Sequence, residues 1–192
     1  MQQRFNSRDG RQLTLRPVRE EDAGQLQNFF AGLSAASRRC RFHGALSGIS
    51  EVCARRLSQV DSRRGVAFVA TTLAGEVVAE ARYSIDAAGR AEFAIAVADG
   101  CTGLGLARRL MSLLLAEARA AGLRTMHGDV LADNDRMLNL MQRCGFALAA
   151  HPHDDGLLRA EFDLVAAPQS NGGWWAALAF LLPASAAFFQ AA

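Results

Sequence analysis

A strand, a glycine loop and a helix follow one another between residues 91 and 122, and this succession limits the folds open to the chain. Apolar residues alternate in the first part, where Phe93, Ile95 and Val97 share one face, so we predict a strand over 91–97. After the loop, leucines recur at i, i+4, i+7 and i+8, which predicts the buried stripe of a helix that begins near residue 106. Gly122 is expected to end that helix.

The loop between this strand and helix is suited to bind an anion. Gly103 and Gly105 lack a Cβ atom, so a ligand can approach the backbone closely. The first amides of the helix and the positive end of its dipole would then point at the ligand. A tight connection without any ligand is an equal alternative, because short glycine patterns are weak motifs. No Lys-Ser/Thr pair follows, which excludes a Walker loop.

The segment Thr102-Gly103-Leu104-Gly105-Leu106-Ala107 resembles the Gln/Arg-x-x-Gly-x-Gly/Ala signature of the GNAT acetyltransferases. The resemblance implies that backbone amides of this segment bind the pyrophosphate of acetyl-CoA. The cofactor contacts that it implies here are Thr102, Gly103, Gly105, Leu106, Ala107 and Arg108. Thr102 stands where the family usually has Gln or Arg, so a long side chain is absent while the amides remain.

The overall composition predicts one compact domain. The 192 residues are 51% hydrophobic, which is sufficient for a core. The net charge of +2 provides no basic field, which argues against a nucleic-acid partner. The four cysteines show no CxxC spacing, so we expect free thiols in a reducing compartment and no metal site. Because the first residues contain no apolar signal region, we expect a cytoplasmic protein.

Hydrophobic periodicity predicts the order strand, two helices, three strands, helix, strand, helix and two strands. The expected strands are 12–16, 66–72, 77–85, 91–97, 125–131, 146–151 and 157–164, with helices near 20–33, 51–58, 106–121 and 134–143. The strand at 125–131 follows a long helix and should lie parallel to 91–97. The basic stretch 34–50 is expected to be irregular, either a solvated connection or a loop that binds substrate.

This order predicts an α+β fold, a three-layer α/β/α sandwich on a mixed, mostly antiparallel sheet. The GNAT family has the same order, and the resemblance runs from residue 13 to about 164. Within the family, the acetyltransferase domain of bacterial protein-lysine acetyltransferases is the most similar, through residues 15–22, 37–42 and 89–93. We therefore expect a GNAT acyltransferase domain over 1–165 and a separate tail over 166–192.

Glu92 is the best candidate for a catalytic base. A lysine-like amine must lose a proton before it attacks a thioester, which costs about 4.6 kcal/mol at pH 7. Glu92 is an acid within an apolar strand, where burial would favour base catalysis, and Ala94 and Ala96 on its face leave room for a substrate. In the lysine-acetylating relatives, the glutamate at this position is the general base. The alternative is a structural glutamate paired with Arg82 or Arg90.

The resemblance also implies where the thioester would lie. It would cross a splay between strands 91–97 and 125–131, with pantetheine held by the backbone from Ile95 to Val97. Asn134 stands where the family contacts the cofactor arm, although it could simply cap a helix. Many members carry a tyrosine acid where this chain has Met141, so the thiolate would leave unprotonated or take a proton from water.

Other polar residues are weaker candidates. His127 and Asp129 share a strand face and could relay protons, although packing is favoured. The stretch 151–155 resembles a metal cluster in composition alone, and its place in a hairpin turn favours a surface role. Cys101 and Cys144 are expected to be small residues of the core or a loop.

The tail carries no charged side chain after Asp163, and residues 174–189 are apolar throughout. It is shorter than the roughly 20 residues that a membrane span needs. Three interpretations of the tail remain open: a packing helix, a membrane-interface anchor and a poorly ordered end. A homodimer contact or a membrane-surface contact through 174–189 is therefore an alternative on sequence grounds.

We expect an acetyl-CoA-dependent N-acetyltransferase that acts on a primary amine, either of a protein lysine or of a small molecule. The rivals are a non-catalytic acyl-CoA sensor and a membrane-associated interaction module.

Overall fold

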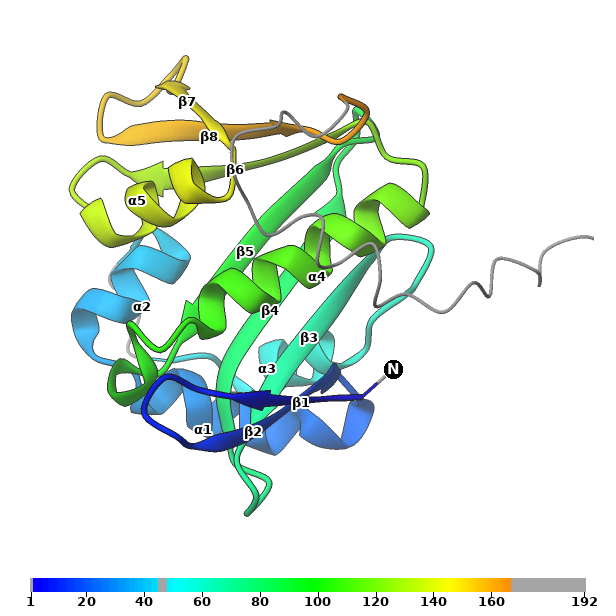
Figure 1. Cartoon of the computed structure of the whole chain (residues 1–192), viewed down its shortest axis with the longest axis vertical. Helices are drawn as coiled ribbons and strands as arrows, with labels where there is room; N and C mark the ends of the chain where they lie inside the picture. Colours follow the sequence, from blue (N-terminus) through cyan, green and yellow to red (C-terminus); the bar gives the residue numbers. More distant parts are fainter. Residues whose placement is uncertain (1, 45–47, 167–192) are drawn as a thin grey trace, which may run out of the picture.

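The computed structural model describes residues 2–44 and 48–166, and these residues form an eight-stranded sheet (Figure 1). The strand order is β1-β2-β3-β4-β5-β6-β8-β7, and every neighbouring pair is antiparallel except β5 and β6. The strands are β1 (Gln3–Asn6), β2 (Gln12–Pro17), β3 (Gly65–Thr71), β4 (Val77–Ile85), β5 (Ala91–Val97), β6 (Thr125–Leu131), β7 (Ala147–Ala150) and β8 (Leu157–Asp163). The predicted mixed, mostly antiparallel sheet is confirmed.

Helices cover both faces of the sheet, which makes the predicted three-layer sandwich (Figure 1). The helical segments are η1 (Glu20–Asp22), α1 (Ala23–Gly32), α2 (Ala35–Phe42), α3 (Glu51–Ser58), η2 (Asp99–Cys101), α4 (Leu106–Ala120) and α5 (Asp135–Arg143). One apolar cluster lies between α4, α5 and the sheet, and a second joins α1 to β3, β4 and β5 on the other side. None of the helices in the described ranges is long and apolar enough to cross a membrane.

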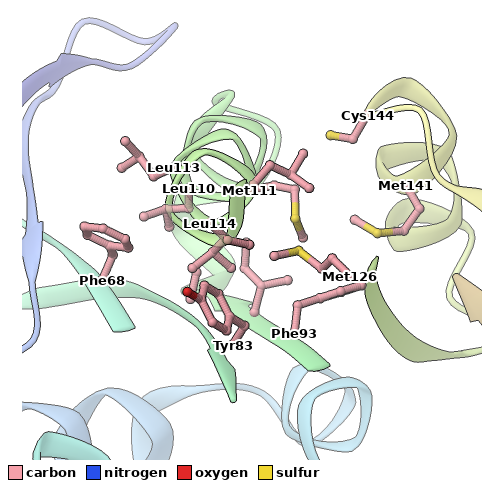
Figure 2. Packing of buried hydrophobic residues seen from close by; sticks show 14 of the residues in the cluster. Phe68, Tyr83, Phe93, Leu110, Met111, Leu113, Leu114, Met126, Met141 and Cys144 are labelled. Atoms are coloured by element: carbon pink, nitrogen blue, oxygen red, sulfur yellow. The ribbon is translucent and has the colours of Figure 1, made fainter. Parts of the chain in front are cut away.

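The main core lies under α4, whose leucine stripe is buried against β4 and β5 (Figure 2). Aromatic rings continue this core toward β8. The ring of Phe146 packs edge-on against Phe93 and tilted against Phe162, at centroid distances of 5.3 and 5.2 Å. Met141 is fully buried and points into the core beside Met126. The expected helix 106–121 and the parallel placement of 125–131 are thus confirmed.

Two elements differ from the sequence-based expectation. The polar strand β1 has too little apolar alternation to be predicted, and it forms by pairing with β2. The stretch predicted as irregular contains α2, an arginine-rich helix without a buried apolar stripe for periodicity to detect. Its first turn is stabilised by Ser34, whose hydroxyl accepts a hydrogen bond from the Ser37 amide. The tail expected over 166–192 lies outside the described residues except for Ala166.

Gly128 in β6 allows the ring of Phe93 to pack directly on the sheet. A Cβ atom at this position would lie 2.7 Å from the ring. We predict that Gly128→Ala lowers the free energy of unfolding by about 1–3 kcal/mol, because an enclosed ring must move. Urea denaturation measures the loss. Gly24→Ala in α1 is the matched control, because a Cβ there meets nothing within 4 Å. Equal stability of the two variants would contradict the tight packing of Phe93.

Candidate active site

Strands β5 and β6 part after only two paired residues. Ala91 pairs with Met126 and Glu92 with His127, and the ladder stops there. Beyond this point β5 stays paired with β4 along its whole length, and β6 stays paired with β8. Each strand therefore follows its own antiparallel partner, and the two diverge (Figure 1). The edge of β5 from residue 93 onward consequently has no strand partner on the side of β6.

A cavity of about 290 Å³ opens where the strands separate. Its walls come from α2, β5, β6 and α5. The lining residues are Cys40, Arg41 and Phe42 of α2 with His43 directly after it, Glu92, Phe93, Ala94 and Ile95 of β5, Asp129 and Val130 of β6, and Asn134 and Met137 at α5. Three of the residues predicted for the site meet here, namely Glu92, Ile95 and Asn134. Val97 and the predicted glycine-loop residues do not line this cavity.

Glu92 is exposed at the inner end of the splay. The expectation that its strand would bury it is wrong, because Glu92 is the exposed residue in the burial pattern of β5. The alternative of a structural ion pair is also wrong. Arg82 pairs with Glu80, and Arg90 pairs with Asp86 at 2.9 Å. Among the described residues Glu92 has no hydrogen-bond or ion-pair partner, so its carboxylate is free to meet a ligand.

A second carboxylate in an apolar strand, Glu80 of β4, has the opposite fate. It is fully buried and pairs with Arg82, while Arg41 of α2 lies 3.5 Å away. The guanidinium of Arg41 also stacks on Phe30 and Phe42, at 5.7 and 5.1 Å from the ring centroids. Sequence reasoning missed Glu80, although a charge within an apolar strand was the signal that singled out Glu92. The buried pair anchors α2 as one wall of the cavity.

The start of α2 is tied to the turn that precedes the glycine loop. The carboxylate of Asp99 accepts hydrogen bonds from the Ser37 hydroxyl at 2.6 Å and from the Ser34 amide at 2.8 Å. These bonds hold the pKa of Asp99 below its ordinary value, with the Ser37 hydroxyl as the largest cause. Further along, Arg39 pairs with Asp133 at 2.9 Å, just before α5. Helix α2 is thus bound to both the loop and the opposite wall.

The glycine loop is open to a ligand. Gly103 and Gly105 have φ angles of +77° and +87°, in the left-handed region that favours glycine. A Cβ on Gly103 would meet nothing within 4 Å, so the bend is open there, whereas a Cβ on Gly105 would lie 3.9 Å from the ring of Phe5 and 4.0 Å from Nε of Arg8. Gly105 precedes α4, whose first-turn amides have no acceptor within the helix. The hydroxyl and the amide of Thr102 both donate to the Asp99 carbonyl, at 2.9 and 3.3 Å. The Leu106 side chain is buried, so Leu106 offers only backbone to a ligand.

The sequence was compared with protein families and with known proteins. A model of the acetyltransferase (GNAT) family matches residues 38–146. The acetyltransferase PA5475 of Pseudomonas aeruginosa is 35% identical over 150 residues, which cover 76% of this chain and 81% of that protein. The chain belongs to the GNAT acetyltransferase family. Acetyl-CoA is the co-substrate of this family, and the open glycine loop and the unpaired edge of β5 fit it.

Solved structures show the same fold. The GNAT domain of S. lividans PAT is 30% identical and superposes with a TM-score of 0.77, covering 84% of this chain and 96% of that domain. The structure of yncA from Salmonella typhimurium, solved with its cofactor acetyl-CoA, is 20% identical with a TM-score of 0.62. It covers 82% of this chain and 98% of yncA, and at this identity it shares the fold alone.

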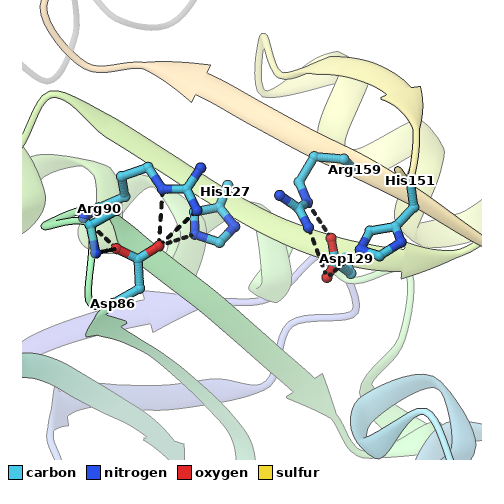
Figure 3. Close-up of polar contacts among 7 residues, drawn as sticks. Asp86, Arg90, His127, Asp129, His151 and Arg159 are labelled. Carbon is cyan, nitrogen blue, oxygen red and sulfur yellow. Dashed lines mark hydrogen bonds and ion pairs between the residues drawn. The ribbon is translucent and has the colours of Figure 1, made fainter. Parts of the chain in front are cut away.

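In this acetyltransferase the other polar candidates, His127 and Asp129, belong to two separate groups of polar contacts (Figure 3). His127 is buried, and its Nε2 lies 3.1 Å from Asp86. The amide of Arg90 is the main reason why the pKa of Asp86 is lowered. Asp129 pairs with Arg159 and lies 3.5 Å from Nε2 of His151. Residues 2–44 and 48–166 hold no group of three or more His, Cys, Asp or Glu that could bind a metal.

The remaining candidates lie in the core or at a helix end. Asn134 caps α5, because its side-chain oxygen accepts from the Met137 amide at 3.1 Å, and it also lines the cavity. Cys101 and Cys144 are buried, as expected. Burial raises the pKa of the Cys144 thiol to about 11, so it stays protonated at neutral pH.

We predict that Asp99→Asn destabilises the acetyltransferase at pH 7. The lowered pKa means that the carboxylate adds stability above its unfolded pKa, and that this stability is lost as pH falls through the folded pKa. The difference in unfolding free energy between wild type and variant should therefore stay level from pH 7 down to the unfolded pKa of the carboxyl group and shrink as pH falls below it. Asp155→Asn, in the exposed loop before β8, is the control. A difference that does not vary with pH would contradict the carboxylate's role.

Proposed function

We propose that the chain is an acetyl-CoA-dependent N-acetyltransferase that transfers acetyl directly to a primary amine, with Glu92 as general base. The observation that carries this proposal is the position of Glu92. It is the last residue of β5 paired with β6, it lines the cavity, and no described residue neutralises it. A base at this point would face both an incoming amine and a thioester that enters along the splay.

The co-substrate would occupy two stretches of backbone. Pantetheine would lie along the edge of β5 from Ile95 to Val97, which has no partner strand on that side. The pyrophosphate would lie on the backbone from Thr102 to Arg108, which is open at Gly103. The side-chain NH2 group of Asn134, across the cavity, would contact the cofactor arm. Bound there, acetyl-CoA supplies an activated acetyl group as a thioester.

Within this arrangement the protein has to move one proton and stabilise one charge. Glu92 accepts a proton from the ammonium group as the nitrogen attacks, and so offsets part of the cost of about 4.6 kcal/mol that prior deprotonation imposes at pH 7. An amide on the open edge of β5 donates to the oxyanion that forms as the amine nitrogen attacks the carbonyl carbon. Met141 is buried in the core and has no acidic proton to donate, so the departing thiolate takes its proton from water.

The cavity favours a cationic acceptor, and we favour a protein lysine over a small-molecule amine. Glu92 and Asp129 both line the cavity, and the charge of Asp129 is shared with Arg159. Carboxylates at the mouth attract an ammonium group before it is deprotonated. The resemblance of residues 15–22, 37–42 and 89–93 to protein-lysine acetyltransferases supports the same choice.

Glu92→Gln tests the base. We expect kcat to fall about 10²- to 10⁴-fold, while CoA still binds, because the amide keeps the shape of the side chain and cannot accept the proton. Release of free thiol measures transfer, and calorimetry measures CoA binding. Glu76→Gln, on the exposed β3–β4 turn, is the matched control and should retain activity. Unchanged thiol release in Glu92→Gln would sink the assignment, and CoA binding without transfer in wild type would favour a sensor.

A panel of acceptors tests the choice of amine. We expect higher kcat/KM for lysine-containing proteins and peptides than for small amines that lack a flanking backbone. The same peptides with each lysine replaced by N-acetyl-lysine serve as controls and should give no thiol release above background. Higher kcat/KM for a small amine than for every peptide and protein would contradict a protein acceptor while leaving the role of Glu92 intact.

A further inference from the structure

The turn between β1 and β2 lies against the glycine loop, although the two are about 90 residues apart in sequence (Figure 1). Arg11 donates from its guanidinium to the carbonyl oxygen of Gly100 at 2.7 Å. The amide of Arg8 donates to the carbonyl oxygen of Leu104 at 3.5 Å. Arg11 is itself held by Asp9. These contacts fix the turn at the start of α4, where the family binds acetyl-CoA.

The side chain of Arg8 lies over Gly105. A Cβ atom on Gly105 would be 4.0 Å from Nε of Arg8 and 3.9 Å from the ring of Phe5. Arg8 is exposed, and among the described residues its guanidinium has no hydrogen bond or ion pair. The acidic neighbours are occupied elsewhere, since Asp9 pairs with Arg11 and Asp99 accepts hydrogen bonds from α2. An uncompensated cation therefore stands beside the glycine loop.

We propose that Arg8 binds the diphosphate of acetyl-CoA and supplies the long side chain that the loop itself lacks. Thr102 replaces the usual Gln or Arg, and its hydroxyl is directed to the Asp99 carbonyl. A diphosphate on the first amides of α4 would lie next to Gly105 and within reach of Arg8. The forked donors of a guanidinium match the oxygens of a phosphate. This inference rests on the binding of acetyl-CoA in the proposed function and does not involve Glu92.

Arg11 is a positioning residue for the contact between Arg8 and the diphosphate, and does not itself touch the ligand. Its bonds to Asp9 and Gly100 hold the hairpin turn on the loop, and the guanidinium of Arg8 is carried with it. The N-terminal hairpin thereby borders the glycine loop.

Calorimetric titration of CoA into the full chain tests the proposal. We expect Arg8→Ala and Arg8→Gln to raise the Kd for CoA about tenfold, because a charge-assisted contact to phosphate is lost. Arg4→Ala removes an equal charge from the exposed side of β1 and is the control, with a change of less than about twofold. The difference between wild type and Arg8→Gln should narrow at high salt, which screens an exposed contact. Thermal unfolding without ligand checks that each variant is folded.

Two truncated ligands, measured by competition, locate the contact. Dephospho-CoA lacks only the 3′-phosphate, and pantetheine lacks the diphosphate and the adenosine as well. The loss caused by Arg8→Ala should be equal for CoA and dephospho-CoA and absent for pantetheine, so that the ratio of CoA to pantetheine affinity falls about tenfold. Wild-type affinity in both Arg8 variants, a loss confined to CoA, or an equal loss for pantetheine would each overturn the assignment. Wild type that binds CoA and transfers nothing would instead overturn the proposed function.

Discussion

The parting of β5 and β6 is the constraint on which the rest of this structure depends. Two parallel pairs hold the strands together, and seven antiparallel pairs hold each of them to its other neighbour. The antiparallel ladders therefore set the direction of each strand, and the parallel pairing of β5 with β6 ends after Glu92. This yields an unpaired backbone edge, a cavity and an exposed carboxylate at one point. The glycine loop and α4 follow directly from the same strand, so a ligand at the loop can extend into the splay.

The cavity owes its other walls to polar contacts, one buried and one exposed, rather than to apolar packing alone. Helix α2 has no fully buried residue, and the pairs of Arg41 with Glu80 and of Arg39 with Asp133 hold it over the opening. Glu80 and Glu92 lie on the same face of the sheet and have different environments. Arginines compensate Glu80 beneath the helix, whereas Glu92 lies where no described cation reaches it.

The regular elements with strong periodicity could be predicted, and those that exist through partners could not. The boundaries of β4 and β5 and the leucine stripe of α4 follow from local pattern. Strand β1 is polar and forms only because β2 offers an edge, and α2 is stabilised by Asp99, 62 residues or more away. At the site, Glu92 and the glycines were recognisable from their sequence context. Arg8 carried no signal, because nothing local indicates that its turn would reach Gly105.

The sequence by itself determined the order of elements, the family signature and the residue types available for the chemistry. These are properties of periodicity and of short motifs, which need no distant partner. The tertiary structure alone decided that Glu92 is exposed and unpaired, that Glu80 is buried and compensated, and that the N-terminal hairpin borders the glycine loop. Burial and charge pairing depend on which segments the sheet order brings together, and hydrogen bonds between distant strands set that order.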